Sequence, residues 1–388
     1  MSDFRTRNRS VAVKLEAKPG EDAAPTLGAN AVRFENPRME YALDTERSEE
    51  VTGSLDRFPS QATGGGARFT GRTIAKGPGT PGQAPESGVL FRASAMSETL
   101  LASDLSGMAQ AGAQGEITLA AGDGANAAIG QVVTLTGGTG GGQTRVIRSV
   151  DSGTDIAGVY PNWDTPPDAT SQYTVHASAL YVPASSALEN QTIYQWRHNT
   201  RGGAMHRLDK LLGGAGTWQL EVQTRRIARF SWTFNGKLGA PQDVADPGTP
   251  SYDDVQGVPF MDADVFLGGS RIRFNQLRLD YGGEVQQADD PGDIYGVDVG
   301  AVTERLIQGS LNPPLSQLSV RDVLSDFLAA TESPLWVRWG NTPGRRLSIF
   351  LPAIRPMVPE DEDVNGFGHE TVPFEANGID TGVYILAY

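Results

Sequence analysis

Apolar and polar residues alternate with a period of two along much of the chain, and clusters of glycine, proline and aspartate separate the alternating runs. This period is typical of half-buried β-strands, and the clusters are typical of turns. The runs predict strands at residues 10–15, 32–41, 116–119, 131–136, 143–150, 172–176, 192–198, 204–212, 217–224, 226–238, 335–339, 347–354, 371–375 and 383–388. The chain is therefore predicted to be mainly β.

Two segments have apolar residues at helical spacing instead. The first is residues 86–101, which read ESGVLFRASAMSETLL and follow Pro85. In the second, Ser319 is a suitable N-cap and Asp322 occupies the capping-box position. One face of this second helix would carry Val320, Val323, Leu324, Phe327 and Leu328. One helix is therefore predicted in each half of the chain.

One stretch of the chain occurs twice. Residues 32–41 read VRFENPRMEY, and residues 272–281 read IRFNQLRLDY, so the two align without a gap. The identical positions are Arg33 and Arg273, Phe34 and Phe274, Arg38 and Arg278, and Tyr41 and Tyr281. A glycine precedes both copies at the same spacing. We interpret the match as an internal duplication, with coincidence as the alternative.

Each copy alternates in polarity, and Pro37 interrupts the first, which predicts a strand with a kink or bulge. The arginines would then face solvent or contact another chain. The candidate anchors between subunits or between domains are Arg33, Arg38, Tyr41, Arg273, Arg278 and Tyr281, together with the strand tryptophans Trp196, Trp218 and Trp232. Strand tryptophans also suggest carbohydrate stacking, but their period-two spacing favours core or interface packing.

A second pair of matching segments supports the duplication. Asn199 begins the turn NTRG after a strand that contains tryptophan, and Asn341 begins the turn NTPG in the same setting. The copies are 240 positions apart at Arg33 and Arg273 but 142 apart at these turns, so the first copy contains 98 additional residues. Residues 112–177, rich in Gly, Thr and Ala, supply most of that difference and predict an inserted small β module.

The predicted organisation follows from these matches. Residues 1–30 form an N-terminal arm and first strand, and residues 31–111 with 178–239 form the first domain. Residues 112–177 form the inserted module, residues 240–267 a linker rich in proline and aspartate, and residues 268–388 the second domain. The polar residues 56–66 predict a protruding loop.

The composition narrows the possible functions. The chain has 388 residues and no cysteine, which excludes disulfides and thiolate chemistry. Its net charge of −14 argues against a module that grips nucleic acid, because such modules cluster lysine and arginine. A negative charge is compatible with a surface along which nucleic acid moves without binding. The alternative explanation is that the charge only keeps the protein soluble. No apolar run is long enough to span a membrane and no signal peptide is recognised, so synthesis in a cytosol is expected.

No catalytic residue, cofactor or metal site is predicted, and the chain is not expected to be an enzyme. A zinc pair of His198 and His206 is disfavoured because a turn separates them. Residues 137–145 lack the Lys-Ser/Thr of a phosphate-binding loop and predict a hairpin turn. The acidic residues 360–363 lack the ligand spacing of a calcium loop and predict a solvated loop.

Three segments resemble the tail tube protein family, the major tail proteins of long-tailed bacteriophages. Residues 15–41 are similar to the opening strands of that family, and residues 84–100 (APESGVLFRASAMSETL) resemble its Pro-then-LLRA helix. Residues 192–241, from TIYQWRHNTRGG to FNGKLGAP, resemble its hairpin and closing strands. The insert is similar to a small β module that recurs in phage structural proteins.

The resemblance implies two tandem tube domains, each a β-sandwich with a flanking helix, whose inner sheets join across subunits into a closed barrel around a lumen. Rings of six such domains stack into a tube. Two domains per chain imply three chains per ring with pseudo-sixfold symmetry, and the alternative is six chains with the second domain outside. The inserted module is expected on the tube exterior, because a lumen that admits duplex DNA has no room for it.

The implied partners are further copies of the chain, a tape-measure protein and transiting DNA in the lumen, and terminator and tail-tip proteins at the ends. The implied location is the virion tail, assembled in the host cytoplasm and without a membrane. The alternative function is a tail-tip, baseplate or receptor-binding protein on the same fold. A third class, a secreted carbohydrate-active enzyme, would need a carboxylate pair that the sequence does not reveal.

Overall fold

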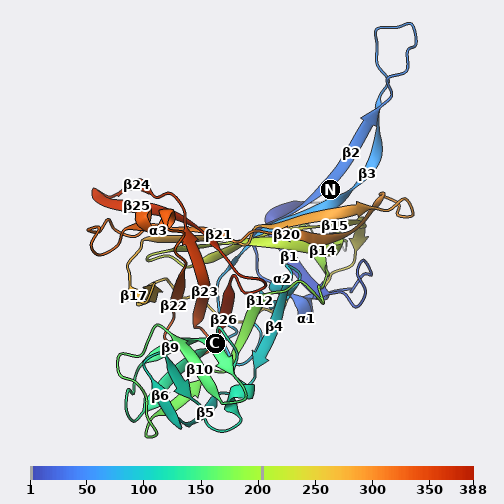
Figure 1. Cartoon of the computed structure of the whole chain (residues 1–388). Helices are drawn as coiled ribbons and strands as arrows, with labels where there is room; N and C mark the ends of the chain where they lie inside the picture. The colour runs from blue at the N-terminus through green and yellow to red at the C-terminus, as the bar shows by residue number, and fades with distance from the viewer. Residues whose placement is uncertain (1–2, 202–204) are drawn as a thin grey trace.

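The computed structural model describes residues 3–201 and 205–388, and the chain is mainly β, as its polarity pattern predicts. Most strands belong to one branched antiparallel sheet, while seven strands form a separate sheet. A third, two-stranded unit is the hairpin of β19 (Gly283–Asp289) and β20 (Val297–Arg305). In Figure 1 the seven-stranded module lies at the bottom, and a long hairpin arm projects at the top.

One series of paired strands, here termed the long row, runs through both halves of the chain. In order of pairing it consists of β2 (Glu35–Arg47), β3 (Ser60–Ile74), β15 (Arg229–Val244), β14 (His206–Gln223), β18 (Gln276–Asp280), β21 (Gln308–Leu311), β25 (Phe367–Ala376) and β24 (Glu360–Val364). The halves meet at the β14–β18 ladder, where Glu221 lies opposite Arg278. The two predicted domains therefore share one continuous sheet.

A second row of strands completes the main sheet. It consists of β4 (Met96–Leu101), β12 (Ser178–Pro183), β26 (Tyr384–Ala387), β23 (Leu347–Pro356), β22 (Ser333–Trp339), β16 (Asp264–Leu267) and β17 (Ser270–Arg271). The end of β23 also pairs with β25, which joins the two rows. On the other side, β1 (Phe4–Leu15) pairs with β13 (Gln191–Asn199), and β13 pairs with β14.

The two halves of the long row have the same strand order and the same register. The order β2, β3, β15, β14 in the first half recurs as β18, β21, β25, β24 in the second. Corresponding pairs are Arg38–Thr70 and Met39–Phe69 in the first half, and Arg278–Ser310 and Leu279–Gly309 in the second. Each residue of these second-half pairs lies 240 positions after its counterpart in the first half. The two copies of the repeated stretch have the same separation in the sequence.

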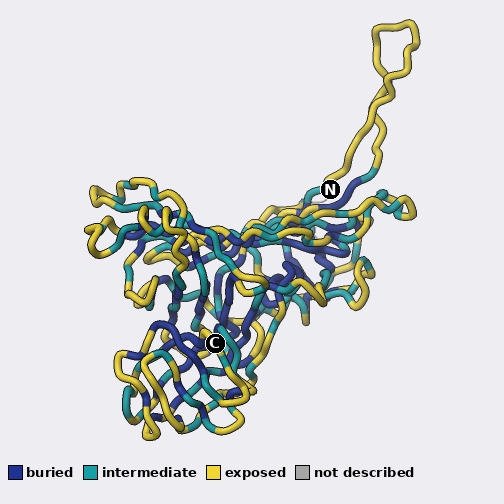
Figure 2. Tube along the Cα trace, viewed as in Figure 1, coloured by how far each residue is buried: buried dark blue, intermediate teal, exposed yellow. Residues whose placement is uncertain are grey.

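The interruption predicted at Pro37 is confirmed. The register of β2 against β3 shifts between Glu35 and Arg38, and Asn36 has a φ of +52°. Beyond the repeat, β2 continues to Arg47 and forms the long arm with β3. The predicted protruding loop lies earlier than expected, at residues 48–59, because residues 60–66 belong to β3. Figure 2 shows this tip as exposed, in contrast to the buried centre of the molecule.

Aromatic rings from both rows form the centre of the main core. Phe91 of α2 (Gly88–Arg92) lies with its ring centroid 4.8 Å from that of Tyr181 and 5.0 Å from that of Trp232. Trp218 and Phe230 complete the contacts of this ring. The core therefore packs the second row, which contributes Tyr181, against the long row.

The helix predicted at residues 86–101 is wrong over most of its length. Only α2 is helical, and the left-handed conformation of Ala95 (φ +56°) ends the helical segment. Residues Met96–Leu101 form β4 instead, because β12 offers them a complete antiparallel partner. Tertiary pairing has outweighed the local helical spacing.

The second helix is α3 (Val323–Leu328), and its predicted N-cap is also wrong. The carboxylate of Asp322, not Ser319, caps this helix by accepting a hydrogen bond from the Ser325 backbone N–H at 2.9 Å. Of the predicted apolar face, Val323 is buried, while Val320, Leu324 and Leu328 are exposed. Two further short helical turns are α1 (Leu27–Asn30) and the 3₁₀ turn η1 (Asp123–Ala125).

The predicted linker, residues 240–267, is packed against the body. β15 extends into its start and β16 occupies its end. Between these strands, the Phe260 ring stacks on Phe274 with centroids 5.4 Å apart. The N-terminal segment is likewise docked, because β1 pairs with β13 along most of its length.

The inserted module is a seven-stranded sheet with its own core. Its strands, in order of pairing, are β5 (Leu105–Met108), β11 (Gln172–Val175), β8 (Val132–Gly137), β9 (Thr144–Asp151), β10 (Ile156–Tyr160), β7 (Glu116–Thr118) and β6 (Ala111–Ala113). The module sheet thus begins at β5, before the predicted boundary at residue 112. The hairpin predicted at residues 137–145 joins β8 to β9.

Candidate assembly surfaces

In the described part of the chain, the long row ends on both sides in a strand with one unpaired edge. Among the described residues, β2 pairs only with β3, and β24 pairs only with β25. Figure 1 places the two edges at opposite ends of the molecule, with β24 at upper left and β2 at upper right. An unpaired edge presents free backbone N–H and C=O groups, which are able to pair with another chain.

The edge at β24 is acidic. Residues 360–363 were predicted as a solvated loop, and this prediction is wrong, because they form a strand paired with β25. The Glu362 carboxylate accepts a hydrogen bond from the Thr371 hydroxyl at 2.7 Å, which holds it in place. Four consecutive carboxylates also disfavour indiscriminate pairing of this edge.

The edge at β2 carries Arg38 and Tyr41, two of the candidate anchors. The Arg38 Nε lies 2.8 Å from a carboxylate oxygen of Glu40, and the arginine side chain is largely exposed. Tyr41 is 41% exposed, whereas Tyr281, its counterpart in the second copy, is completely buried. The tyrosine at this position of the repeat is therefore buried in the second half of the chain and exposed to solvent in the first.

A buried carboxylate lies at the base of the arm, and the sequence analysis missed it. Asp209 is fully buried in β14 and accepts a hydrogen bond from the Tyr41 hydroxyl at 2.7 Å. Arg197 and Arg207 each place Nε 3.0 Å from one of its carboxylate oxygens. The hydrogen bond to Asp209 raises the pKa of Arg207, while burial raises the pKa of Tyr41. The sequence signal was Arg207, two positions before Asp209 in the same predicted strand.

Tyr281 lies between the two halves of the chain. Its ring stacks on Trp218 of β14, with centroids 5.1 Å apart and an interplanar angle of 18°. Its hydroxyl donates to the Ala95 carbonyl at 2.8 Å, and Arg305 lies against its ring. Burial raises the pKa of Tyr281 to about 12. Two candidate anchors, Trp218 and Tyr281, are thus in direct contact with each other.

The remaining arginine candidates are exposed. The Arg33 guanidinium lies 4.9 Å from the ring centroid of Tyr252, and its backbone N–H donates to Glu86. Arg278 lies opposite Glu221 in the β14–β18 ladder. Arg273 lines a groove beneath α3.

The other tryptophan candidates are buried inside the chain. Trp196 packs against Tyr194, with ring centroids 5.4 Å apart, in a small cluster under β13. Trp232 donates from Nε1 to the Thr73 hydroxyl at 2.8 Å. Neither side chain presents a surface to a carbohydrate or to another subunit, because both are almost fully covered within the chain.

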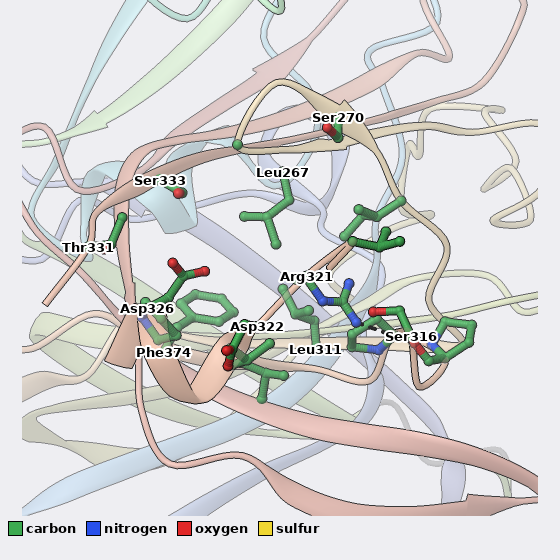
Figure 3. A pocket seen from close by; sticks show the side chains of 18 of the residues that line it. Leu267, Ser270, Leu311, Ser316, Arg321, Asp322, Asp326, Thr331, Ser333 and Phe374 are labelled. Atoms are coloured by element: carbon green, nitrogen blue, oxygen red, sulfur yellow. Dashed lines mark hydrogen bonds between the residues drawn. The ribbon is translucent and has the colours of Figure 1, made fainter. Parts of the chain in front are cut away.

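Several exposed apolar side chains lie on and around α3. Leu315, Leu318, Val320, Leu324 and Leu328 are exposed there. Figure 3 shows the adjoining groove of about 680 Å³, in which Leu311 and Phe374 meet the polar side chains of Arg321 and Asp322. The backbone N–H of Leu315 donates to the Gly368 carbonyl, so this surface adjoins the β24–β25 hairpin. Exposed apolar side chains that gather in one region are typical of a protein interface.

The turn was expected to keep His198 and His206 apart, but the pairing of β13 with β14 places their ring centroids 5.1 Å apart. His198 forms a hydrogen bond with Ser10, and His206 accepts one from the Asn199 backbone N–H. The tip of that turn lies outside the described residues. The described part of the chain contains no group of three or more potential metal ligands.

Comparison with known proteins does not place the chain in a family: no family model matches it, and no curated protein matches it significantly. No helix among the described residues is long and apolar enough to cross a membrane.

Proposed function

We propose that the chain is a structural subunit that assembles, edge to edge, into rings that stack as the tail tube of a long-tailed bacteriophage. One observation carries the proposal: within residues 3–201 and 205–388 the long row ends in unpaired edges at β2 and β24, at opposite ends of the molecule. Contact between two different edges is heterologous, and repetition of such a contact closes a ring when the rotation fits. Ring closure also removes both exposed edges.

The repeated register within the long row favours three chains per ring. If each half supplies one tube domain, three chains supply six domains with pseudo-sixfold symmetry. The arm of β2 and β3 extends from the body, and its tip carries the exposed side chains Val51 and Leu55. We assign this arm to contacts between stacked rings.

In this proposal the chain acts in the virion tail after assembly in the host cytoplasm. Its partners are other copies, the tape-measure protein and transiting DNA in the lumen, and terminator and tip proteins at the tube ends. The net charge of −14 fits a conduit that does not retain DNA. No catalytic role is assigned.

Electron microscopy of the purified chain over a series of concentrations tests the proposal. The expected result is tubes that lengthen with concentration and show three identical chains around the axis. Six identical full-length chains per ring would overturn the stoichiometry. Discrete oligomers that never elongate would instead support the tail-tip or receptor-binding function.

A further inference from the structure

We propose that β2 of one chain pairs antiparallel with β24 of a second copy, with Arg38 opposite the second copy's Glu362. This inference rests on the proposed self-assembly and specifies the strands and the register that perform it. Its template is the contact between the two halves of one chain, where β14 pairs with β18.

The register follows from the correspondence between the halves. On one side of the contact, Arg278 of β18 corresponds to Arg38 of β2. On the other side, β15 pairs Phe234 with Phe69, and β25 pairs Phe374 with Gly309, so that Phe234 corresponds to Phe374.

Counting back from Phe234 and Phe374 identifies the counterpart of Glu221. In β14, Glu221 pairs with Arg229, five residues before Phe234. In β24, Glu362 pairs with His369, which is likewise five residues before Phe374. Glu362 therefore corresponds to Glu221. Because Glu221 lies opposite Arg278 within one chain, Glu362 lies opposite Arg38 between two chains.

Charge and exposure agree with this pairing. The pair repeats the acid–arginine match of Glu221 and Arg278, and opposite charges at facing positions stabilise a ladder. Tyr281 is buried because the β14 half of the chain covers it, whereas its counterpart Tyr41 is 41% exposed in a single chain. The apolar side chains around α3 are exposed beside the same β24–β25 hairpin.

The ladder is short and contains one unfavourable pair. Pro37 has no N–H group, and the register shift next to it ends the regular part of β2 at Arg38. In the same register Glu40 lies opposite Glu360, where the chain-internal template has Asp280 and Gln219 joined by a hydrogen bond of 2.8 Å. Glu360→Gln would place a glutamine opposite Glu40, as Gln219 lies opposite Asp280 within one chain. We therefore expect this variant to lower the concentration needed for assembly about two- to fivefold.

Disulfide trapping tests the register directly, because the chain has no native cysteine. In the full-length chain, Arg38→Cys with Glu362→Cys should yield, on oxidation, covalent dimers and closed trimers. The matched control is Glu221→Cys with Arg278→Cys, which should close within one chain and remain a covalent monomer. A second control, Thr45→Cys with Glu362→Cys, moves one partner far along the arm and should give no link between chains.

The outcomes separate this inference from the proposed function. One outcome is that tubes form and the control disulfide between positions 221 and 278 closes, but no disulfide forms between positions 38 and 362. This result would overturn the pairing and leave the tube function intact. Linked trimers that never stack would support the pairing and overturn the tube. A chain that neither links nor assembles would overturn both. Arg38→Glu should weaken assembly, and the exchange Arg38→Glu with Glu362→Arg should restore it; failure of that rescue would also contradict the register.

Discussion

The Tyr281 ring stacks on the Trp218 ring at the point where the second half of the chain meets the first. Both side chains are completely buried, and the Tyr281 hydroxyl bonds to the Ala95 carbonyl. We expect Tyr281→Ala to lower the free energy of unfolding by about 3–5 kcal/mol, the range for large aromatic truncations in a core. Denaturant unfolding measures this change.

Tyr281→Phe serves as the matched variant at this position. It keeps the stack and removes only the hydroxyl, so its expected cost is about 1 kcal/mol. Equal losses for the two variants would contradict the importance of the ring contact. Ile294→Ala, which truncates an exposed side chain, should change stability little.

The Asp209 carboxylate holds Arg197, Arg207 and Tyr41 together at the base of the arm. Asp209→Asn keeps the shape but leaves the arginines without a buried counter-charge. The expected loss is about 1.5–3 kcal/mol of unfolding free energy, the range for hydrogen bonds to charged groups, because the arginine side chains stay 29% and 39% exposed. Asp44→Asn on the exposed arm is the control and should be nearly neutral. A neutral Asp209→Asn would show that the cluster contributes nothing to stability.

We expect His176 to make the contact between the inserted module and the main sheet sensitive to acid. Burial lowers the pKa of His176 to about 4, and the positive charges of Arg346 and Arg338 act in the same direction, against Asp104. Its ring lies 5.5 Å from that of Tyr388, and Nε2 is 2.8 Å from the Thr134 hydroxyl.

Because its folded pKa lies below the ordinary value, His176 binds a proton more readily in the unfolded state. The contribution of His176 to stability is therefore expected to be complete above about pH 6.5 and to be lost as the pH decreases towards 4, by on the order of 3 kcal/mol in total. Unfolding measured from pH 7 to 4.5 should show a smaller acid loss for His176→Gln than for the natural chain. Identical pH dependence in both would contradict this role.

The inserted module is expected to be removable. Leu101 of β4 pairs with Ser178 of β12, so the two points where the chain enters and leaves the module are adjacent. Replacing residues 103–176 with a short Asn-Gly turn should leave a chain that folds and still assembles. Electron microscopy and unfolding measurements check the two parts of this prediction.

Removal of the module has a stability cost. Val132, Val146 and Tyr160 of the module pack against Phe350 and Tyr384 of the second row, which the deletion exposes. Tyr160→Phe is the milder variant, because it loses only the hydrogen bonds to Pro334 and from Gly269. A folded deletion variant that cannot assemble would contradict a peripheral position of the module.

The polarity pattern predicted the mainly β class and most strands, because alternation is a local property that burial of one sheet face imposes. The repeat in residues 32–41 and 272–281 also located the segments that take the same place in the two halves. The polarity pattern did not predict which strands, far apart in the sequence, pair with each other. β4 has helical spacing in its sequence, and only β12, far along the chain, makes it a strand.

The candidate surfaces were predicted less well than the fold. Arg38 and Tyr41 were named from the repeat, but Glu362 was assigned to a loop, since four adjacent acids have low strand propensity. Asp209 was missed because its arginine partners come from two strands and its tyrosine partner from a third. Such clusters depend on register, which a single sequence does not determine.

The covalent fusion of the two halves has a kinetic consequence. In the proposed ring, alternate domain contacts are β14–β18 ladders that form when the chain folds, so only three of the six contacts require collision between molecules. A tethered partner acts at an effective concentration of the order of millimolar, which reduces the number of slow encounter steps. In the proposed tube the fusion would also separate two symmetries: the wall around the lumen would be nearly sixfold, while the module, present once per chain, would give the outside a strict threefold pattern.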